Sequence, residues 1–313
     1  MSSGKLDPQM RELDFIDWIR SRSEFDPARV PVGPGDDSTV LNCGDEQILV
    51  ATDQVLDGVH FILAEHGPEA AGRKAMARNL SDLAAMAAMP LGAVAAVAMP
   101  KGTTRSDAEG IYCGLRNVGD EFDCPLVGGD VGSWSGPLSV CVTVFGRPSE
   151  GGPVLRSGAL AGDTICVTGA LGGAWQSRRH LDFTPRVAEA VSLAKQYDLH
   201  AMIDISDGLA VDLGRLCAAS GVAAEVVAAN VPIQADVEGA DAAARLAAAM
   251  SDGEDYELLF ALPAEQAGQL VACQPLAVAV SRIGDFVEGG KLSLIRPDGS
   301  REELMPQGWE HRT

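Results

Sequence analysis

The chain has 313 residues, of which 46% are hydrophobic and 22% charged, so it can bury the cores of two globular domains. It carries 44 acidic and 24 basic residues, a formal net charge of −20. This balance, with no basic stripe, argues against any role that depends on neutralising the phosphate backbone of a nucleic acid. An anionic substrate would need metal ions, a few placed arginines or helix N-termini.

Nothing in the sequence predicts a membrane or secreted protein. Residues 1–15 are polar and lack the apolar core of a signal peptide. The longest apolar run, residues 83–99, is broken by Pro90 and Gly92, which favours a helix end followed by a strand. Seven cysteines lie singly in apolar surroundings, which predicts buried, reduced thiols. We therefore expect a cytoplasmic protein with no membrane contact.

After a predicted amphipathic helix over residues 8–20, the chain reaches an acidic stretch at residues 32–60. Asp36 and Asp37 follow a Gly-Pro-Gly turn, and an apolar strand is expected to end at Thr52 and Asp53. Both acidic clusters could then face one site, and such oxygen ligands suit Mg²⁺. The alternative is a solvated turn and a helix cap.

A strong helix is predicted at residues 67–89, with Pro68 near its start and Pro90 after its end. Inside it lie Asn79, Ser81 and Asp82, which are poor helix-interior residues. A solvent-facing patch would explain them. Their apolar neighbours favour instead a buried polar face directed at a ligand.

The next predicted elements are a strand at residues 91–99 and a helix at residues 106–120. A short apolar strand follows and leads into Gly129 and Asp130. The glycines would allow the backbone to approach a phosphate closely. A further strand is expected at residues 138–145. The Gly-rich segment that follows it is the best linker candidate, so we place a domain boundary near residue 150.

The second half contains two further acidic motifs. A strand ending near Ile205 delivers Asp204 and Asp207 with Ser206 between them, and Ser206 or Asp207 is expected to cap a helix at residues 209–219. The amides at such a helix start can bind an anion. Later, four acids within residues 251–257 precede an apolar strand, which is more than an ordinary solvated loop requires.

Nine strings occur in the order and at the spacing of one known family. They are GDD, TDQVLDGVHF, GRKAMARNLSDLAAMAAMP, LVGGD, RSGA, VTG, DISDGLAVDL, GEDYELLF and GWEH. From about residue 13 to residue 311, the chain resembles the thiamine-monophosphate kinases.

The resemblance implies an α/β fold like that of aminoimidazole ribonucleotide synthetase. Residues 1–150 would form an N-terminal ATP/Mg²⁺-binding domain whose mixed sheet pairs with its copy in a homodimer, and residues 151–313 would form a C-terminal α/β domain. It also implies phosphorylation of thiamine monophosphate to thiamine diphosphate, with ATP as co-substrate and Mg²⁺ as cofactor.

The resemblance also assigns roles to individual residues. The nucleotide would lie near Gly129, Asp130, Arg156 and Ser206, and the thiamine end near His60, Glu254 and Trp309. The chain departs from the family pattern at Val131-Gly132, Asp182-Phe183, Asp252 and Arg312. The implied metal ligands are Asp37, Thr52, Asp53, Asp82, Asp130, Asp204 and Asp207. Five of them would also serve catalysis: Asp37, Asp53, Asp82, Asp130 and Asp207.

The chemistry agrees with the composition. The acceptor in such a reaction is a phosphate oxygen that is already anionic, so the enzyme needs charge neutralisation and in-line placement rather than a strong base. Two alternatives stay open: a related ATP-dependent enzyme acting on another small molecule, and a noncatalytic nucleotide- or metal-binding protein on the same scaffold.

Overall fold

The structure, a computed structural model, describes residues 12–239, 241–305 and 308. In its N-terminal half the elements are α1 (Glu12–Arg22), β1 (Thr39–Cys43), β2 (Glu46–Leu56), α2 (Leu63–Ala85), β3 (Ala88–Pro100), α3 (Arg105–Glu121), β4 (Leu126–Trp134) and β5 (Ser139–Pro148). In its C-terminal half they are β6 (Asp163–Thr168), α4 (Arg179–Asp182), α5 (Val187–Gln196), β7 (Ala201–Asp204), α6 (Leu209–Ser220), β8 (Ala223–Val227), the 3₁₀ helix η1 (Ala228–Asn230), α7 (Ala242–Ser251), β9 (Leu258–Pro263), α8 (Ala264–Cys273), β10 (Val280–Val287), β11 (Ser293–Ile295) and β12 (Arg301–Glu303).

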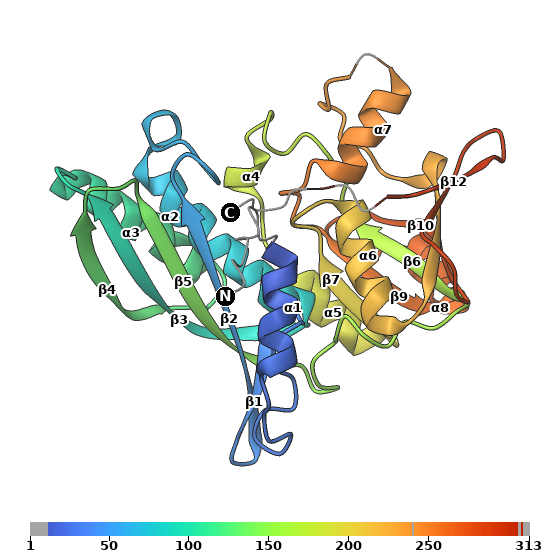
Figure 1. Ribbon diagram of the computed structural model, residues 1–313, viewed down its shortest axis with the longest axis horizontal. Coiled ribbons are helices and arrows are strands. Elements are labelled where there is room, and N and C mark those ends of the chain that lie inside the picture. The colour runs from blue at the N-terminus through green and yellow to red at the C-terminus, as the bar shows by residue number, and fades with distance from the viewer. Residues whose placement is uncertain (1–11, 240, 306–307, 309–313) are drawn as a thin grey trace, which may run out of the picture.

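The N-terminal sheet has one covered face. Its strand order is β1-β2-β5-β3-β4, and only β3 and β4 pair in parallel. Helices α2 and α3 pack against it (Figure 1). Val140, Val142 and Val144 alternate along β5 and are all buried, as expected for a strand with one covered face. On the edge strand β4, however, Val127 and Val131 are each 68% exposed, so the sheet ends in an apolar edge.

Helix α2 joins the two halves of the molecule. The core cluster around Leu80 and Leu83 extends from Val144 of the first sheet to Phe260 of the second. A break at Gly67, with φ 79° and ψ 167°, separates a first short turn from the main helix. The long helix therefore begins at Pro68, where proline is well tolerated, while helical backbone already starts four residues before Gly67 at Leu63.

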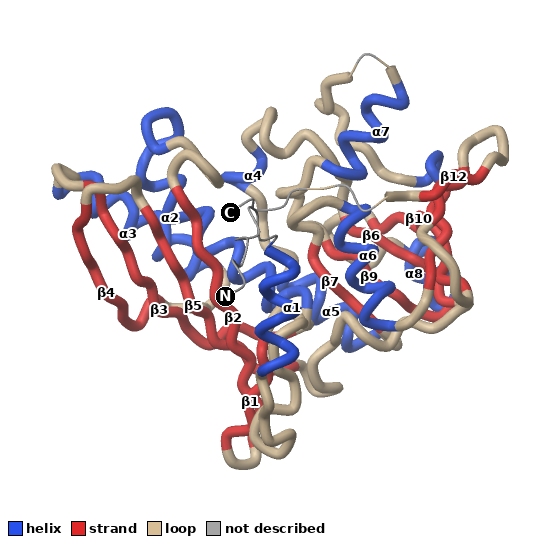
Figure 2. The backbone as a smooth tube through the Cα atoms, viewed as in Figure 1, coloured by secondary structure: helices blue, strands red, loops and turns tan. Residues whose placement is uncertain are grey.

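The C-terminal half is built on a mixed sheet of seven strands in the order β12-β11-β8-β10-β6-β9-β7. Figure 2 shows the two sheets as separate groups of strands. A second core cluster fills this half, with Ile203 of β7, Leu213 of α6 and Phe286 of β10 among its members. Strand β7, at one edge of the sheet, lies beside α2.

Two expectations about strand ends are wrong. Strand β2 continues past Thr52 and Asp53 to Leu56, because it pairs with β5 along this whole segment. Strand β4 likewise continues through Gly129 and Asp130 to Trp134, paired with β3. These acids therefore lie within strands and not in the turns that follow them.

The cysteines are less uniformly buried than their sequence context predicts. All seven are free thiols, but Cys43, Cys113 and Cys273 are exposed. Over the part of the chain that the structure describes, no helix is both long and apolar enough to cross a bilayer.

Helices α2 and α3 approach so closely that two glycines are required between them. A Cβ atom on Gly72 would lie 2.1 Å from the backbone oxygen of Ile111, and one on Gly114 would lie 2.0 Å from the backbone oxygen of Glu69. Two backbones, and not flexible side chains, would have to move apart to admit a methyl group.

We therefore expect Gly114→Ala to lower the free energy of unfolding by about 1–3 kcal/mol, the usual cost of overpacking. Gly268 of α8 is the matched control, because a Cβ there meets nothing within 4 Å. Gly268→Ala should instead stabilise the protein by about 0.5–1 kcal/mol. Urea and thermal unfolding of both variants would test this, and equal shifts would contradict the close packing.

Candidate active site

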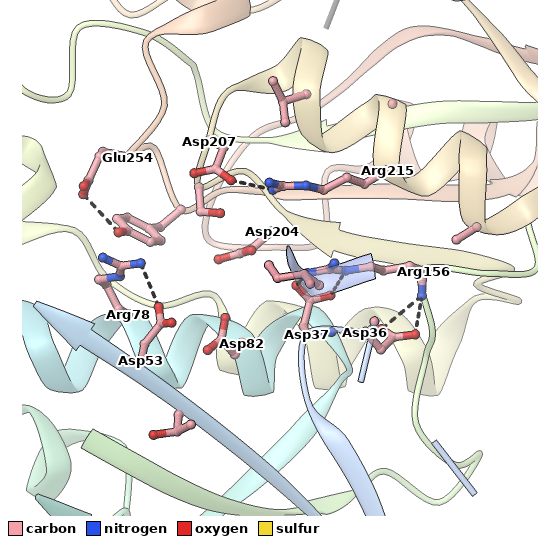
Figure 3. A pocket seen from close by; sticks show the side chains of 18 of the residues that line it. Asp36, Asp37, Asp53, Arg78, Asp82, Arg156, Asp204, Asp207, Arg215 and Glu254 are labelled. Carbon is pink, nitrogen blue, oxygen red and sulfur yellow. Dashed lines mark hydrogen bonds and ion pairs between the residues drawn. The ribbon is translucent and has the colours of Figure 1, made fainter. Parts of the chain in front are cut away.

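A cavity of about 1060 Å³ lies between the two halves of the chain (Figure 3). The N-terminal half contributes β2, α2 and the turn before β1 to its wall, and the C-terminal half contributes α6 and the loops after β7 and before β9. Most of the site residues predicted from the sequence line it: Asp37, Thr52, Asp53, His60, Asp82, Arg156, Asp204, Ser206, Asp207 and Glu254.

Three carboxylates from distant parts of the chain meet in this cavity. Asp37, Asp82 of α2 and Asp204 at the end of β7 each place an oxygen atom within 4.8 Å of the others. Burial and the charge of Asp53 raise the pKa of Asp82 well above its usual range. Burial and the charge of Asp37 raise the pKa of Asp204. The mutual repulsion of these carboxylates is therefore relieved either by protonation or by a bound cation.

This donor set fits a hard divalent cation such as Mg²⁺, which prefers oxygen ligands. Ser81, the neighbour of Asp82 on α2, orients one of these carboxylates by donating a 2.5 Å hydrogen bond to Asp204 Oδ2. Thr52 is placed differently, because its hydroxyl donates to the carbonyl of Val142 at 3.1 Å on the sheet surface.

The loop after β7 is fixed by Asp212, which the sequence analysis did not single out. Its Oδ2 accepts hydrogen bonds from the amides of Ser206, Asp207 and Gly208 at 3.0–3.1 Å. The expected cap by Ser206 or Asp207 is wrong: Gly208 is the N-cap, at φ 119°, and makes no side-chain cap bond. An acid in the first turn of α6 replaces the cap by reaching back to the loop.

Arginines pair with carboxylates around the cavity. Arg156 binds Asp37 through two bonds, Nε to Oδ2 at 3.0 Å and Nη2 to Oδ1 at 2.5 Å. Arg215 Nη1 bridges Asp207 at 2.6 Å and Asp212 at 2.7 Å. Arg78 Nη2 lies 2.8 Å from Asp53 Oδ2. In this way the field of the acidic residues is partly neutralised by the chain itself.

Lys74 is a second residue that the sequence analysis missed. It is fully buried, with Nζ 2.6 Å from both Glu254 Oε2 and the carbonyl of His60, and 2.8 Å from His180 Nδ1. Burial lowers the pKa of Lys74 to about 8, against the opposing charge of Glu254. The signal for this residue was the spacing of Lys74, Arg78 and Asp82, which are four residues apart on one helix.

Two predicted site residues that the structure describes are not brought to this cavity. Gly129 and Asp130 are exposed on β4, at the sheet edge far from β2, and do not line the cavity as the described residues form it (Figure 1). Trp309 lies outside the described residues.

Comparison with known proteins places this architecture in a family. The model of the AIR synthase related protein, N-terminal domain, matches residues 35–147, and that of the C-terminal domain matches residues 161–296. Thiamine-monophosphate kinase from Rhodopirellula baltica is 38% identical over 96% of this chain and 97% of its own length. The Escherichia coli protein of the same name is 35% identical, with 95% of each chain covered.

Solved structures agree with the sequence comparison. The complex of AaThiL with AMPPCP and TMP has a TM-score of 0.81 and 26% identity, covering 99% of this chain and 100% of its own. Thiamine-monophosphate kinase from Stenotrophomonas maltophilia K279a has a TM-score of 0.74 and 34% identity, covering 95% and 98%. The expected two-domain α/β fold is confirmed. The chain belongs to the thiamine-monophosphate kinase family.

Proposed function

We propose that this protein transfers the γ-phosphoryl group of ATP to thiamine monophosphate and so produces thiamine diphosphate. Membership of the family supports the reaction. The single structural observation that carries it is the convergence of Asp37, Asp82 and Asp204 in a cavity between the two halves. That cavity is large enough for two phosphorylated molecules placed end to end.

In this mechanism the protein positions the two substrates and neutralises the charge of their phosphates, and it does not need to transfer protons. The attacking phosphate oxygen of the acceptor is already anionic, so no strong general base is required. Asp37, Asp82 and Asp204 would hold Mg²⁺, with Asp53 and Asp207 in the same cavity, and the bound metal would offset the charge of the ATP phosphates and of the acceptor phosphate. The walls of the cavity keep the reacting groups in line.

The two ends of the cavity suit different ligands. Arg156, Ser206 and Arg215 lie toward α6, whose Val211 and Ala218 add an apolar wall suited to a nucleoside. Glu254 lies toward the other end (Figure 3), and His60 is near it, because Lys74 Nζ is 2.6 Å from both Glu254 Oε2 and the His60 carbonyl. A carboxylate there favours the cationic ring system of thiamine. We assign Trp309 to that end on family resemblance alone.

We also propose that the protein is a homodimer formed through residues 1–150, with residues 151–313 completing each site. The apolar edge at Val127 and Val131 supports this, because a second copy could cover it. Gly129 and Asp130 lie between those two valines, so they could approach a cavity only from the partner copy.

Free thiols also agree with a cytoplasmic location.

A coupled assay for ADP formation tests the function directly. We expect turnover with thiamine monophosphate and ATP, and little with thiamine or with aminoimidazole ribonucleotide precursors. Turnover with a precursor would indicate another enzyme of the superfamily. Binding of ATP without turnover of any acceptor would indicate a noncatalytic protein.

Asp82→Asn keeps the side-chain volume but removes a charge from the cluster. We expect its turnover to fall by about 100-fold or more, the order of loss when one electrostatic stabiliser is removed. Its fold should survive, because the buried charge repels its neighbours.

The same variant should change the pH dependence of stability measured in EDTA. The raised pKa values of Asp82 and Asp204 mean that, above pH 3.8, the folded wild type binds more protons than the unfolded chain. Its free energy of unfolding therefore falls as the pH rises from 3.8 toward the raised pKa values. This slope should be shallower in Asp82→Asn. Mg²⁺ at pH 8 should raise the unfolding temperature of the wild type more than that of the variant. Equal Mg²⁺ shifts would argue against a metal role for Asp82.

The dimer can be tested by light scattering over a range of protein concentrations. We expect the wild type to be a dimer and Val131→Glu to shift it toward a monomer, because a charge would be placed in the covered edge. Leu160→Glu is the matched control, since Leu160 is 57% exposed and lies in the other half. A wild type that stays monomeric at every concentration would refute the dimer.

A further inference from the structure

Arg78 of α2 stands where the acidic cluster meets the acceptor end of the cavity. Its guanidinium contacts Asp53, and the charges of Asp53, Glu254 and Asp82 all act on it. In Figure 3 it lies on the side of Asp82 that faces Glu254, whereas Arg156 and Arg215 lie on the opposite side. If the proposed function holds, the phosphate of the acceptor must occupy this region, between the metal ligands and the thiamine end.

The hydrogen bonds of Arg78 are incomplete. Within the part of the chain that the structure describes, only Nη2 makes an ion pair, with a single oxygen of Asp53 at 2.8 Å. Nε and Nη1 are buried and have no hydrogen-bond partner among the described residues. Arg156, by contrast, satisfies two of its nitrogens with the two oxygens of Asp37. A buried charged donor without an acceptor is unfavourable. The pairing with Asp53 leaves two nitrogens of Arg78 without acceptors among the described residues, and a ligand with several oxygens could supply them.

The charge around the acceptor end also calls for a cation from the chain. Asp53, Asp82 and Glu254 would repel an incoming phosphate, and the protein as a whole carries a formal charge of −20. Lys74 is nearby, but it is fully buried and already holds Glu254. Arg215 is held by Asp207 and Asp212. Arg78 is therefore the cavity-lining cation best placed to meet that phosphate.

We propose that Arg78 binds the phosphate group of the acceptor and thereby makes the site select a phosphate monoester over the corresponding alcohol. On binding, the guanidinium exchanges the single oxygen of Asp53 for phosphate oxygens, which match its planar set of donors. Asp53 is then released toward the metal cluster. Nothing in this step requires proton transfer or bond cleavage.

Arg78→Met tests the proposal, because it keeps the stem of the side chain and removes the donors. Calorimetric titration with thiamine monophosphate, thiamine and ADP, each in the presence of Mg²⁺ and without turnover, gives three dissociation constants. We expect that for thiamine monophosphate to rise by about tenfold or more, the effect of losing a charge-assisted hydrogen bond. Those for thiamine and ADP should change by less than about twofold.

Arg116→Met is the matched control, since it removes the same group from an exposed pair with Asp120 on α3. It should leave all three constants unchanged. Arg78→Lys keeps the charge without the planar fork and should give an intermediate loss of preference for the phosphorylated ligand. If circular dichroism shows that Arg78→Met does not fold, the dissociation constants of Arg78→Lys alone test the proposal.

Equal weakening of thiamine monophosphate and thiamine, or of ADP, would overturn the proposal and leave Arg78 as a structural partner of Asp53. The same follows if the preference is unchanged in every folded variant. Failure of the wild type to form ADP with thiamine monophosphate would instead refute the proposed function. The two results are therefore separable.

Discussion

The repulsion between Asp37, Asp82 and Asp204 is the constraint on which the site depends. Three carboxylates within 4.8 Å of one another in a partly buried place are unfavourable unless the surrounding structure holds them there. Helix α2 does so from between the two sheets, with a core cluster that reaches into both halves. The stability of that core supports a cluster that would otherwise move apart, and a divalent cation would relieve the same strain.

One face of α2 links the two ends of the cavity. Lys74, Arg78 and Asp82 follow at intervals of four residues, so their side chains lie along one side of the helix. The first holds Glu254 at the proposed acceptor end, the second contacts Asp53, and the third belongs to the carboxylate cluster that we propose holds Mg²⁺. A single helix therefore sets the distance between Glu254 and the carboxylate cluster, and under the proposed function this gives the fixed placement that phosphoryl transfer requires.

The arginine pairs show how an acidic protein can line a cavity that we propose binds anions. Arg156 on Asp37, Arg215 on Asp207 and Arg78 on Asp53 each neutralise a carboxylate that is proposed to meet metal or phosphate. Such pairs reduce the charge of the cavity without ligands. When anions and cations enter together, the arginines can turn to the anions and the carboxylates to the cations, so net charge changes little.

The sequence by itself determined the fold class through its resemblance to a known family, and it pointed to most of the acids in the cavity because motifs such as NLSDLAAM and DISDGL place acids next to apolar segments whose burial is predictable. It could not locate the ends of β2 and β4, since these depend on pairing with strands far away in the chain. Nor could it reveal the partners of Lys74, because Glu254 and the carbonyl of His60 come from other parts of the chain. Only the tertiary structure decided those contacts, and it left Asp130 at an outer edge because a strand's neighbours, and not its own residues, fix its place in a sheet.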